Sequence, residues 1–381
     1  MKILFVSIPN HHFFQWANQL KDSGHEVYWF DITDGAGFSS KIDWVTQYAG
    51  WKIKWNYPFR HRVKKYFPQW YSWIQNRNER SAAKVFSRLV ERIQPDVIHV
   101  FEMQLAGYPI FSVLQKYAAI PLIYSSWGSD MFQYERLGLT TTFVQRFLQR
   151  VDFLITDCHR DHDKALSLGF KNTFLGVFPG NGGIHFLQEA IQPQTQRKYI
   201  MVKGYEDGVG KALVILKAMA HYIPQILEEY KLIVYSADEP VLKYLGASAY
   251  YQKVQPMVFP RNQHQPNEQI LTLMGQSALH VASSVSDGMP NVVLEAMGMG
   301  AFPIQSNPGQ VTEEVIQHGK NGLLIAFPES EEEIANLMRQ AITNSTLREE
   351  AQEYNVNFMH SQYERDQLRA KIVALYSQIL Q

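Results

Sequence analysis

Cysteine is almost absent from this sequence, since Cys158 is the only one in 381 residues. A single thiol excludes an internal disulfide framework and any zinc site built from several cysteines. The sequence also lacks a run of about 18 apolar residues, which a membrane-spanning helix requires. Met1 leads directly into an apolar strand pattern, without the core or cleavage site of a signal peptide. We therefore expect a cytoplasmic globular protein.

The sequence has no excess of either charge, because lysine and arginine balance aspartate and glutamate. Positive charge nevertheless concentrates in residues 51–92, where only Glu79 and Glu91 oppose many lysines and arginines. Aromatic residues, including Trp70 and Trp73, alternate with these cations. Two interpretations fit: a peripheral contact with an anionic membrane surface, or a solvated helix pair whose aromatic side chains pack inward. We expect no nucleic-acid partner.

The chain is longer than one hydrophobic core usually allows, which favours two domains of Rossmann-like size. Short apolar strand patterns alternate with helical patterns in both halves, typical of doubly wound parallel α/β sheets. A polar stretch, 188–197, has the composition of a linker. We predict one domain at 1–190, a second at 191–360 and a C-terminal helix at 361–381. Within the second domain, residues 312–318 are predicted to form a helix.

Residues 283–291 follow a predicted strand, at the end where open α/β sheets bind ligands. Gly288 permits a turn, and Met289 precedes Pro290, which suits the first position of a helix. The free amides around Asn291 would then face a diphosphate. Further along this helix lies Glu295, on the same face as Asn291. Its carboxylate suits the hydroxyls of a ribose, and Asp287 suits those of a sugar. Alternatively, both acids are ordinary charges near a helix start.

The run from Asp287 to Pro303 resembles the signature of glycosyltransferase family 4: a carboxylate, seven residues, Glu-Ala-Met and then Gly-x-Pro. This resemblance implies the GT-B fold, in which two Rossmann-like domains face each other across a cleft and the C-terminal helix returns to the first domain. It also implies that the domain at 1–190 binds the acceptor and the domain at 191–360 binds the nucleotide sugar. It places Glu295 on the nucleotide ribose and Asp287 on the donor sugar. The family usually has glutamate where this chain has Asp287. Similar enzymes generally need no metal, and we expect no cofactor.

A second loop with anion-binding features opens the second domain. Lys203 and Gly204 end a predicted strand, and Lys211 stands at the start of the next helix. Lysines and backbone amides in this arrangement suit a pyrophosphate, and Lys211 is the better candidate to stabilise the leaving group. The loop lacks the Gly-Lys-Ser/Thr of a Walker A motif, and no dinucleotide fingerprint follows the first strand.

The acceptor is expected in the first domain. The loop from Ser126 to Asp130 resembles a family loop that reads His-Gly-x-Asp, with Trp127 in place of the histidine. A tryptophan can stack on a sugar, although a buried structural role is equally open. Residues Asn10, His11 and His12 lie in the first strand-to-helix loop, where the family places acceptor contacts; capping or solvated histidines are the alternative. The stretch around Glu314 also resembles the family.

Together these features predict a glycosyltransferase, and the resemblance to family 4 implies a hexosyltransferase that retains the anomeric configuration. The donor would be a UDP-, GDP- or ADP-sugar, with Asp287, Glu295 and Lys211 in catalytic roles. The acceptor would be a saccharide or a lipid-linked sugar, in bacterial surface-polysaccharide synthesis at the inner face of the membrane. Two alternatives remain open: a sugar-nucleotide epimerase on the same fold, and a non-catalytic subunit that binds nucleotide sugars.

Overall fold

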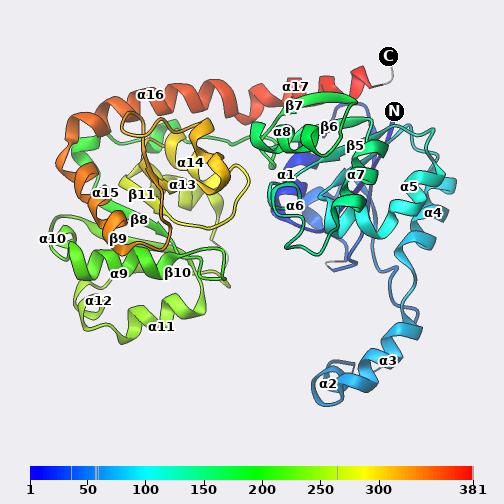
Figure 1. Cartoon of the computed structure of the whole chain (residues 1–381), viewed down its shortest axis with the longest axis horizontal. Helices are drawn as coiled ribbons and strands as arrows, with labels where there is room; N and C mark the ends of the chain where they lie inside the picture. The colour runs from blue at the N-terminus through cyan, green and yellow to red at the C-terminus, as the bar shows by residue number, and fades with distance from the viewer. Residues whose placement is uncertain (36, 56–57, 59, 264, 380–381) are drawn as a thin grey trace. The chain divides into compact units, whose positions relative to one another are not determined.

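The structure is a computed structural model that describes residues 1–35, 37–55, 58, 60–263 and 265–379. The chain divides into two compact units (Figure 1). Unit 1 contains residues 1–157, 161–182 and the described residues from Arg369 onward, and unit 2 contains residues 158–160 and 183–368. Each unit is built on a parallel sheet with helices, which confirms the predicted α/β class.

The sheet of unit 1 has the strand order β3-β2-β1-β4-β5-β6-β7. Its strands are β1 (Lys2–Ser7), β2 (Glu26–Asp31), β3 (Thr46–Tyr48), β4 (Val97–Phe101), β5 (Leu122–Ser125), β6 (Phe153–Thr156) and β7 (Thr173–Val177). The chain runs outward from β1 to β3 and then returns to add β4 on the other side of β1. The direction of winding therefore changes between β1 and β4, which is where a doubly wound sheet binds ligands.

The helices of unit 1 follow from local sequence signals, as α4 illustrates. The Ser81 side chain accepts the amide of Lys84 at its start. At its end, Gln94 adopts a left-handed conformation with φ 50° before Pro95. The described helices of this unit are α1 (His11–Gln19), α2 (Arg60–Tyr66), α3 (Pro68–Asn78), α4 (Ala82–Ile93), α5 (Phe111–Lys116), α6 (Ser129–Phe132), α7 (Thr141–Arg150), most of α8 (His159–Ser167) and most of α17 (Arg365–Gln378).

The end of α17 is anchored in unit 1 through a buried polar network. The Tyr376 hydroxyl accepts the indole N–H of Trp16 at 2.9 Å and bonds to Nδ1 of His99 at 2.7 Å. The other ring nitrogen of His99 lies 2.8 Å from the Ser125 hydroxyl. Burial lowers the pKa of His99 well below its usual value, so the ring is neutral. The predicted C-terminal segment 361–381 is thus divided, since residues up to Leu368 group with unit 2.

The sheet of unit 2 has the order β10-β9-β8-β11-β12-β13. Its strands are β8 (Tyr199–Lys203), β9 (Lys231–Ala237), β10 (Met257–Pro260), β11 (Ser277–Ala282), β12 (Phe302–Ser306) and β13 (Leu323–Ile325). The winding changes direction between β8 and β11. Its helices are α9 (Ala212–Tyr222), α10 (Ile226–Glu229), α11 (Glu239–Ala247), α12 (Ala249–Val254), α13 (Asn267–Gly275), α14 (Asn291–Gly298), α15 (Glu331–Thr343) and α16 (Ser345–Tyr363).

The chain passes from unit 1 to unit 2 between Gly182 and Gly183, whereas the sequence placed the boundary between residues 190 and 191. Residues that follow Gly183 pack on unit 2. The Phe186 ring stacks on His360 at 4.4 Å, and it lies so close to Gly298 that a Cβ there would overlap the ring. Leu187 and Ala190 join the same apolar cluster. The polar composition of 188–197 does not reveal this packing.

The helix predicted at 312–318 is wrong, because only a short 3₁₀ turn forms at Thr312–Glu314. The Asn321 side chain takes over the backbone groups that a longer helix would use. Its carbonyl oxygen accepts the amide of Gln317 at 2.7 Å, and its amide donates to the carbonyl of Val315 at 3.0 Å. Side chains of this type compete with helical hydrogen bonds, so the segment continues as a turn.

Candidate functional site

Two loops of unit 2 meet at the switch point of its sheet. The loop after β8 spans 204–211 and the loop after β11 spans 283–290. The Lys211 amide donates to the Ser283 carbonyl at 2.9 Å, and the Val285 amide donates to the Val209 carbonyl at 3.0 Å. The two loops therefore pair along the carboxyl ends of adjacent strands, the position that ligands occupy in open α/β sheets.

Glycines allow the first of these loops to run close to its neighbours. A Cβ on Gly204 would lie 2.6 Å from the Ala237 Cα, at the end of β9. The Gly204 amide instead donates to the Tyr235 carbonyl at 2.8 Å. A Cβ on Gly210 would lie 2.5 Å from the Tyr205 side chain. Gly204, predicted to bind the donor, thus has a packing role in addition.

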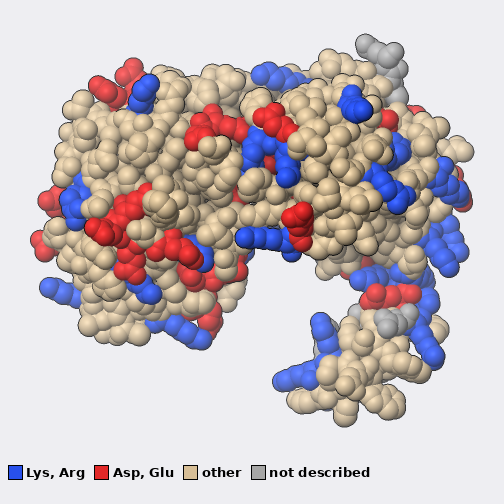
Figure 2. Space-filling view, viewed as in Figure 1, with Lys and Arg blue, Asp and Glu red and all other residues tan. Residues whose placement is uncertain are grey.

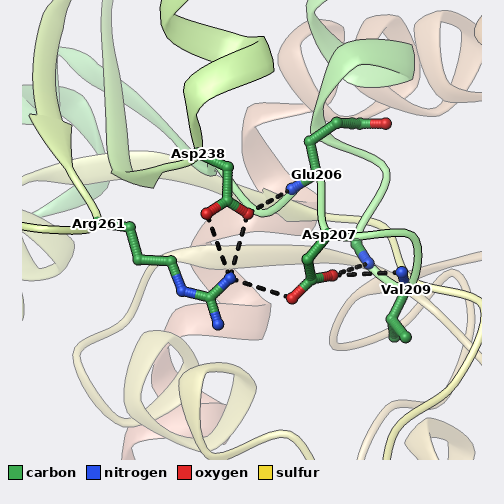
Figure 3. Close-up of polar contacts among 6 residues, drawn as sticks. Glu206, Asp207, Val209, Asp238 and Arg261 are labelled. Carbon is green, nitrogen blue, oxygen red and sulfur yellow. Dashed lines mark hydrogen bonds and ion pairs between the residues drawn. The ribbon is translucent and has the colours of Figure 1, made fainter. Parts of the chain in front are cut away.

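Acidic side chains hold the 204–211 loop in shape. Asp207 accepts the amides of Val209 and Gly210 at 3.2 and 3.0 Å, and Asp238 accepts the amide of Glu206 at 2.9 Å (Figure 3). Arg261 joins the two aspartates through its Nη1 atom, 3.0 Å from Asp207 and 3.1 Å from Asp238. The loop is therefore ordered by side-chain contacts before any ligand binds.

Glu295 is buried in the site, with 9% of its surface exposed. It lies on α14, whose first residue is Asn291 and whose N-cap is Pro290, so proline precedes the helix rather than occupying its first position. Burial raises the pKa of Glu295 to about 7, against a hydrogen bond with Asn267 and the charge of Lys203, which both lower it. Near neutral pH this carboxyl exchanges its proton, a property common at functional sites.

Asp287 lies in the second loop and is half-buried. Burial raises its pKa, and the charges of Lys203 and Arg160, with a hydrogen bond from the Gly288 amide, act in the opposite direction. Lys203 therefore acts on both predicted donor acids. Met289, between them in sequence, is buried among apolar side chains of unit 2.

Lys211 has a different partner. Its ammonium lies 2.7 Å from a carboxylate oxygen of Glu329, an exposed residue after β13. The Lys211 backbone is fixed by its bond to Ser283, so the side chain starts from the donor loop but pairs with a neighbouring one. The structure thus groups Lys203, Asp287 and Glu295, and it joins Lys211 to Glu329.

Two buried aromatic residues support this group from within the sheet, and the sequence patterns did not single them out. The Tyr235 hydroxyl lies 2.9 Å from Nε2 of His280. Burial and the charge of Lys203 lower the pKa of His280 to about 3, so its ring is neutral. The sequence signal that could have identified this pair is a histidine in the mostly apolar strand β11.

In unit 1 the structure brings two predicted acceptor residues together. The rings of His12 and Trp127 have centroids 6.3 Å apart, and Trp127 is half-buried. His11 is exposed beside His12. Asn10 serves as the N-cap of α1, where its side chain accepts the Phe13 amide at 2.8 Å.

Asp130 is buried and organises the loop that carries Trp127. Its oxygens accept the amides of Met103 and Trp127, both at 2.8 Å, and the hydroxyl of Tyr124 at 2.6 Å. These three hydrogen bonds are a structural reason for an aspartate at this buried position. Any role in acceptor binding stays a prediction.

Glu102, which the sequence did not indicate, lies beside Asp130 at the end of β4. Its side chain accepts the amides of Gln104 and Leu105. Its backbone has φ 72°, an unusual conformation for a residue with a side chain. Burial and the charge of Asp130 raise the pKa of Glu102 to about 8.

Glu314, from the second family-like stretch, caps the start of α8. Its two oxygens accept the amides of His159 and Arg160 at 2.8 and 2.9 Å. The Arg160 guanidinium also donates to the Pro308 carbonyl at 3.0 Å. The carboxylate therefore caps the first residues of α8, which group with unit 2.

Two protein-family models match this chain, one mainly in unit 1 and one in unit 2. Residues 187–358 match the family of glycosyl transferases group 1, and residues 74–158 match the family described as glycosyl transferase 4-like. No curated protein matches the sequence. None of the described helices has the length and apolar content needed to cross a membrane.

Solved structures share the fold of the whole chain at low sequence identity. Sucrose-phosphate synthase from Thermosynechococcus elongatus is 14% identical with a TM-score of 0.73, covering 100% of this chain and 99% of that one. A glycosyltransferase from Rickettsia africae is 12% identical with a TM-score of 0.69, covering 100% and 98%. HepE from Anabaena, in complex with UDP and glucose, is 13% identical with a TM-score of 0.68, covering 99% and 100%.

Proposed function

The chain is a GT-B-fold glycosyltransferase with group 1 and 4-like domains, and we propose that it transfers a sugar with retention from a nucleotide sugar to a saccharide or lipid-linked acceptor. The observation that carries this proposal is the cluster of Lys203, Asp287 and Glu295 at the switch point of unit 2. HepE, solved with UDP-glucose, supports a nucleotide-sugar donor by similarity of fold.

The donor would lie along the paired loops of unit 2. The Glu295 carboxylate accepts hydrogen bonds from the ribose hydroxyls, and Asp287 accepts them from hydroxyls of the donor sugar. Lys203 and the start of α14 face the diphosphate, because a cation and free helix amides both stabilise negative charge. Lys211 joins them when it exchanges Glu329 for a phosphate oxygen.

In the proposed reaction the bond between the anomeric carbon and the diphosphate oxygen breaks first. The acceptor hydroxyl attacks the same face and forms the new glycosidic bond, and its proton passes to the leaving phosphate oxygen. The leaving group gains negative charge in this step, so Lys203 and Lys211 stabilise the transition state electrostatically. No metal or other cofactor takes part in this scheme.

The acceptor would bind unit 1 against His12 and Trp127. An aromatic ring and an imidazole offer a stacking face and hydrogen bonds to a neutral sugar. Asn10 and His11 border this pair, and Asp130 holds its loop. The chemistry of this surface matches a saccharide better than an anion.

A screen of UDP-, GDP- and ADP-linked sugars tests the function. At least one should raise the melting temperature of the protein, because a ligand that binds only the native state stabilises it by mass action. Lys203→Gln should weaken this shift, while Lys243→Gln, an exposed lysine paired with Glu239, should leave it unchanged. If no nucleotide sugar binds the wild-type protein, the proposal fails.

The basic and aromatic stretch at 51–92 contains α2, α3 and most of α4. Several of its large aromatic side chains are exposed rather than packed inward. Trp70, on α3, is 70% exposed. Lys64 and Lys65, on α2, are exposed as well. Figure 2 shows basic side chains on this part of the surface. The other exposed aromatic residues of this stretch are Trp55, Tyr66, Phe67 and Trp73. Phe59 and Tyr57 lie outside the described residues.

We propose that this surface binds an anionic membrane, which would bring the enzyme to a lipid-linked acceptor of surface-polysaccharide synthesis. Tryptophan and tyrosine favour the interface of a bilayer, and lysines are attracted to its negative surface. The paired substitutions Lys64→Glu and Lys65→Glu should reduce binding to phosphatidylglycerol vesicles severalfold at low salt. Lys217→Glu with Lys253→Glu, two lysines of unit 2, serves as the control. Unchanged vesicle binding in the first variant would argue against a membrane role.

A further inference from the structure

The loop after β13 brings a carboxylate to the donor loops. Residues 326–330 form this loop, and its backbone is held from two sides. The Glu333 carboxylate accepts the first two amides of the loop at 2.8 and 2.7 Å, and the Ser283 hydroxyl donates to the Pro328 carbonyl at 2.9 Å. Glu329 is the next residue, so the backbone sets its place beside the loop that follows β11.

Ser283 anchors both members of the ion pair between Lys211 and Glu329. Its carbonyl accepts the Lys211 amide at 2.9 Å, and its hydroxyl holds the carbonyl of the residue before Glu329. The ammonium and a carboxylate oxygen meet at 2.7 Å. The Lys211 side chain is 20% exposed and that of Glu329 is 69% exposed. The lysine is therefore mostly covered, and the carboxylate is the partner that can move away into solvent.

In this pair the Glu329 carboxylate holds the place that a phosphate oxygen would take. Both groups are anionic hydrogen-bond acceptors for a lysine ammonium. A diphosphate on the paired loops would need the same ammonium, because Lys211 starts from one of these loops. An ion pair with so exposed a partner is weak, so a diphosphate with several charges can displace the carboxylate.

We propose that Glu329 is an internal competitor, which neutralises Lys211 in the free enzyme and lowers the affinity of the donor site for diphosphates. The inference rests on the proposed nucleotide-sugar site. Only the fraction of molecules in which Lys211 is free binds a diphosphate with full strength, so the apparent affinity falls by that fraction. The competitor acts on the donor and on the nucleoside diphosphate product, and it favours release of the product after transfer.

Calorimetry with inorganic pyrophosphate at low ionic strength tests this competition, because surface ion pairs are then least screened. Glu329→Gln removes the charge and keeps the size of the side chain. This variant should bind pyrophosphate about two- to fivefold more tightly than the wild-type protein. Glu332→Gln, at an exposed acid of α15, changes the net charge equally and should leave the affinity within about 1.5-fold.

A double-mutant cycle separates competition for Lys211 from a general effect of charge. In the Lys211→Gln background, Glu329→Gln should give no gain in affinity, because the ammonium for which the two anions compete is missing. An equal gain in both backgrounds, or no gain in either, would overturn the inference. Weaker binding in Glu329→Gln would overturn it too, since Glu329 would then hold Lys211 in place for the ligand.

Titrations with UDP, GDP and ADP keep this test distinct from the test of the function. If pyrophosphate or one of these nucleotides binds the wild-type protein and the cycle shows no coupling, the inference fails and the proposed donor site stands. If none of them binds the wild-type protein or Glu329→Gln, the proposed function fails together with the inference.

Discussion

The two sheets of this protein end in loops of different chemistry. At the switch point of unit 2, Lys203 acts electrostatically on both Asp287 and Glu295. At the switch point of unit 1, the two neighbouring acids, Glu102 and Asp130, accept backbone amides of the loop after β4. Both edges use acids to fix their own backbone, since Asp207 and Asp238 accept loop amides in unit 2. The unit 2 edge in addition groups a lysine with two further acids.

Burial of an acidic side chain has different consequences at the two sheet edges. Burial raises the pKa of Glu295 and of Glu102, to about 7 and about 8. The positive charge of Lys203 acts on Glu295 and stabilises its ionised form. The negative charge of Asp130 acts on Glu102 and destabilises the ionised form of that carboxyl. At the unit 1 edge, the side chains that we propose to face a ligand are His12 and Trp127. This contrast favours an anionic donor on unit 2 and a neutral saccharide on unit 1.

The largest expected effect comes from removing the ribose-binding acid. Glu295→Ala should lower kcat/KM for the donor by about 10²- to 10³-fold, because each hydrogen bond to a charged group contributes roughly 1.5–3 kcal/mol. Steady-state kinetics with a saturating acceptor would measure this loss, and circular dichroism would show that the fold is retained. Wild-type activity in the variant would remove Glu295 from the site.

Asp130→Asn is the matched change in unit 1. The asparagine amide offers one acceptor oxygen fewer, so at least one of the buried donors that Asp130 satisfies loses its acceptor. This change should lower stability by roughly 1–3 kcal/mol. Its kcat/KM for the donor, per folded molecule, should stay within a few-fold of wild type. A donor defect as large as that of Glu295→Ala would break the contrast between the two edges.

A smaller effect should appear in the dependence on pH. The pKa of Glu295 rises from 4.5 to about 7 on folding, so the folded state keeps a proton that the unfolded state loses. Wild-type stability should therefore decrease as pH rises from about 4.5 to 7, and this decrease should be smaller in Glu295→Gln, which keeps the contribution of Glu102 but lacks that of Glu295. Above pH 7 the variant should be more stable than the wild-type protein by about 3 kcal/mol, since the pKa differs by about 2.5 between the two states and each unit corresponds to about 1.36 kcal/mol.

Urea unfolding of both proteins between pH 5.5 and 8.5 measures this difference. Wild-type donor affinity should also increase over the same range, because the carboxylate accepts hydroxyl protons better than the carboxylic acid does. Parallel stability curves for the two proteins would show that Glu295 is already ionised at low pH.

The smallest effect is expected at the acceptor surface. Trp127→Ala should raise the acceptor KM by about 3- to 10-fold, which matches the loss of one aromatic stacking contact. Trp127→Phe should retain most of the affinity, and donor binding should be unaffected in both variants. Kinetics with a panel of octyl glycosides would test this. An altered donor affinity with an unchanged acceptor KM would assign Trp127 to the donor instead.

Local pattern predicted most of the architecture because it is set by residues close in sequence. The apolar run Ile3 to Val6 forms the central strand β1, and Glu295 lies on the helix that follows β11, as expected. The helix at 312–318 failed because Asn321, outside the predicted segment, binds the backbone groups of that segment. The periodicity of apolar residues gives no sign that a side chain farther along the chain binds these backbone groups.

By itself, the sequence determined the two α/β sheets and the position of the Asp287–Glu295 segment at the end of a strand. Only the tertiary structure decided the ionisation of Glu295, the pairing of Lys211 with Glu329 and the orientation of Arg261. Each depends on groups far apart in the chain, such as Asn267 beside Glu295. Burial and electrostatic contact act through space, so they become visible only when the fold brings these groups together.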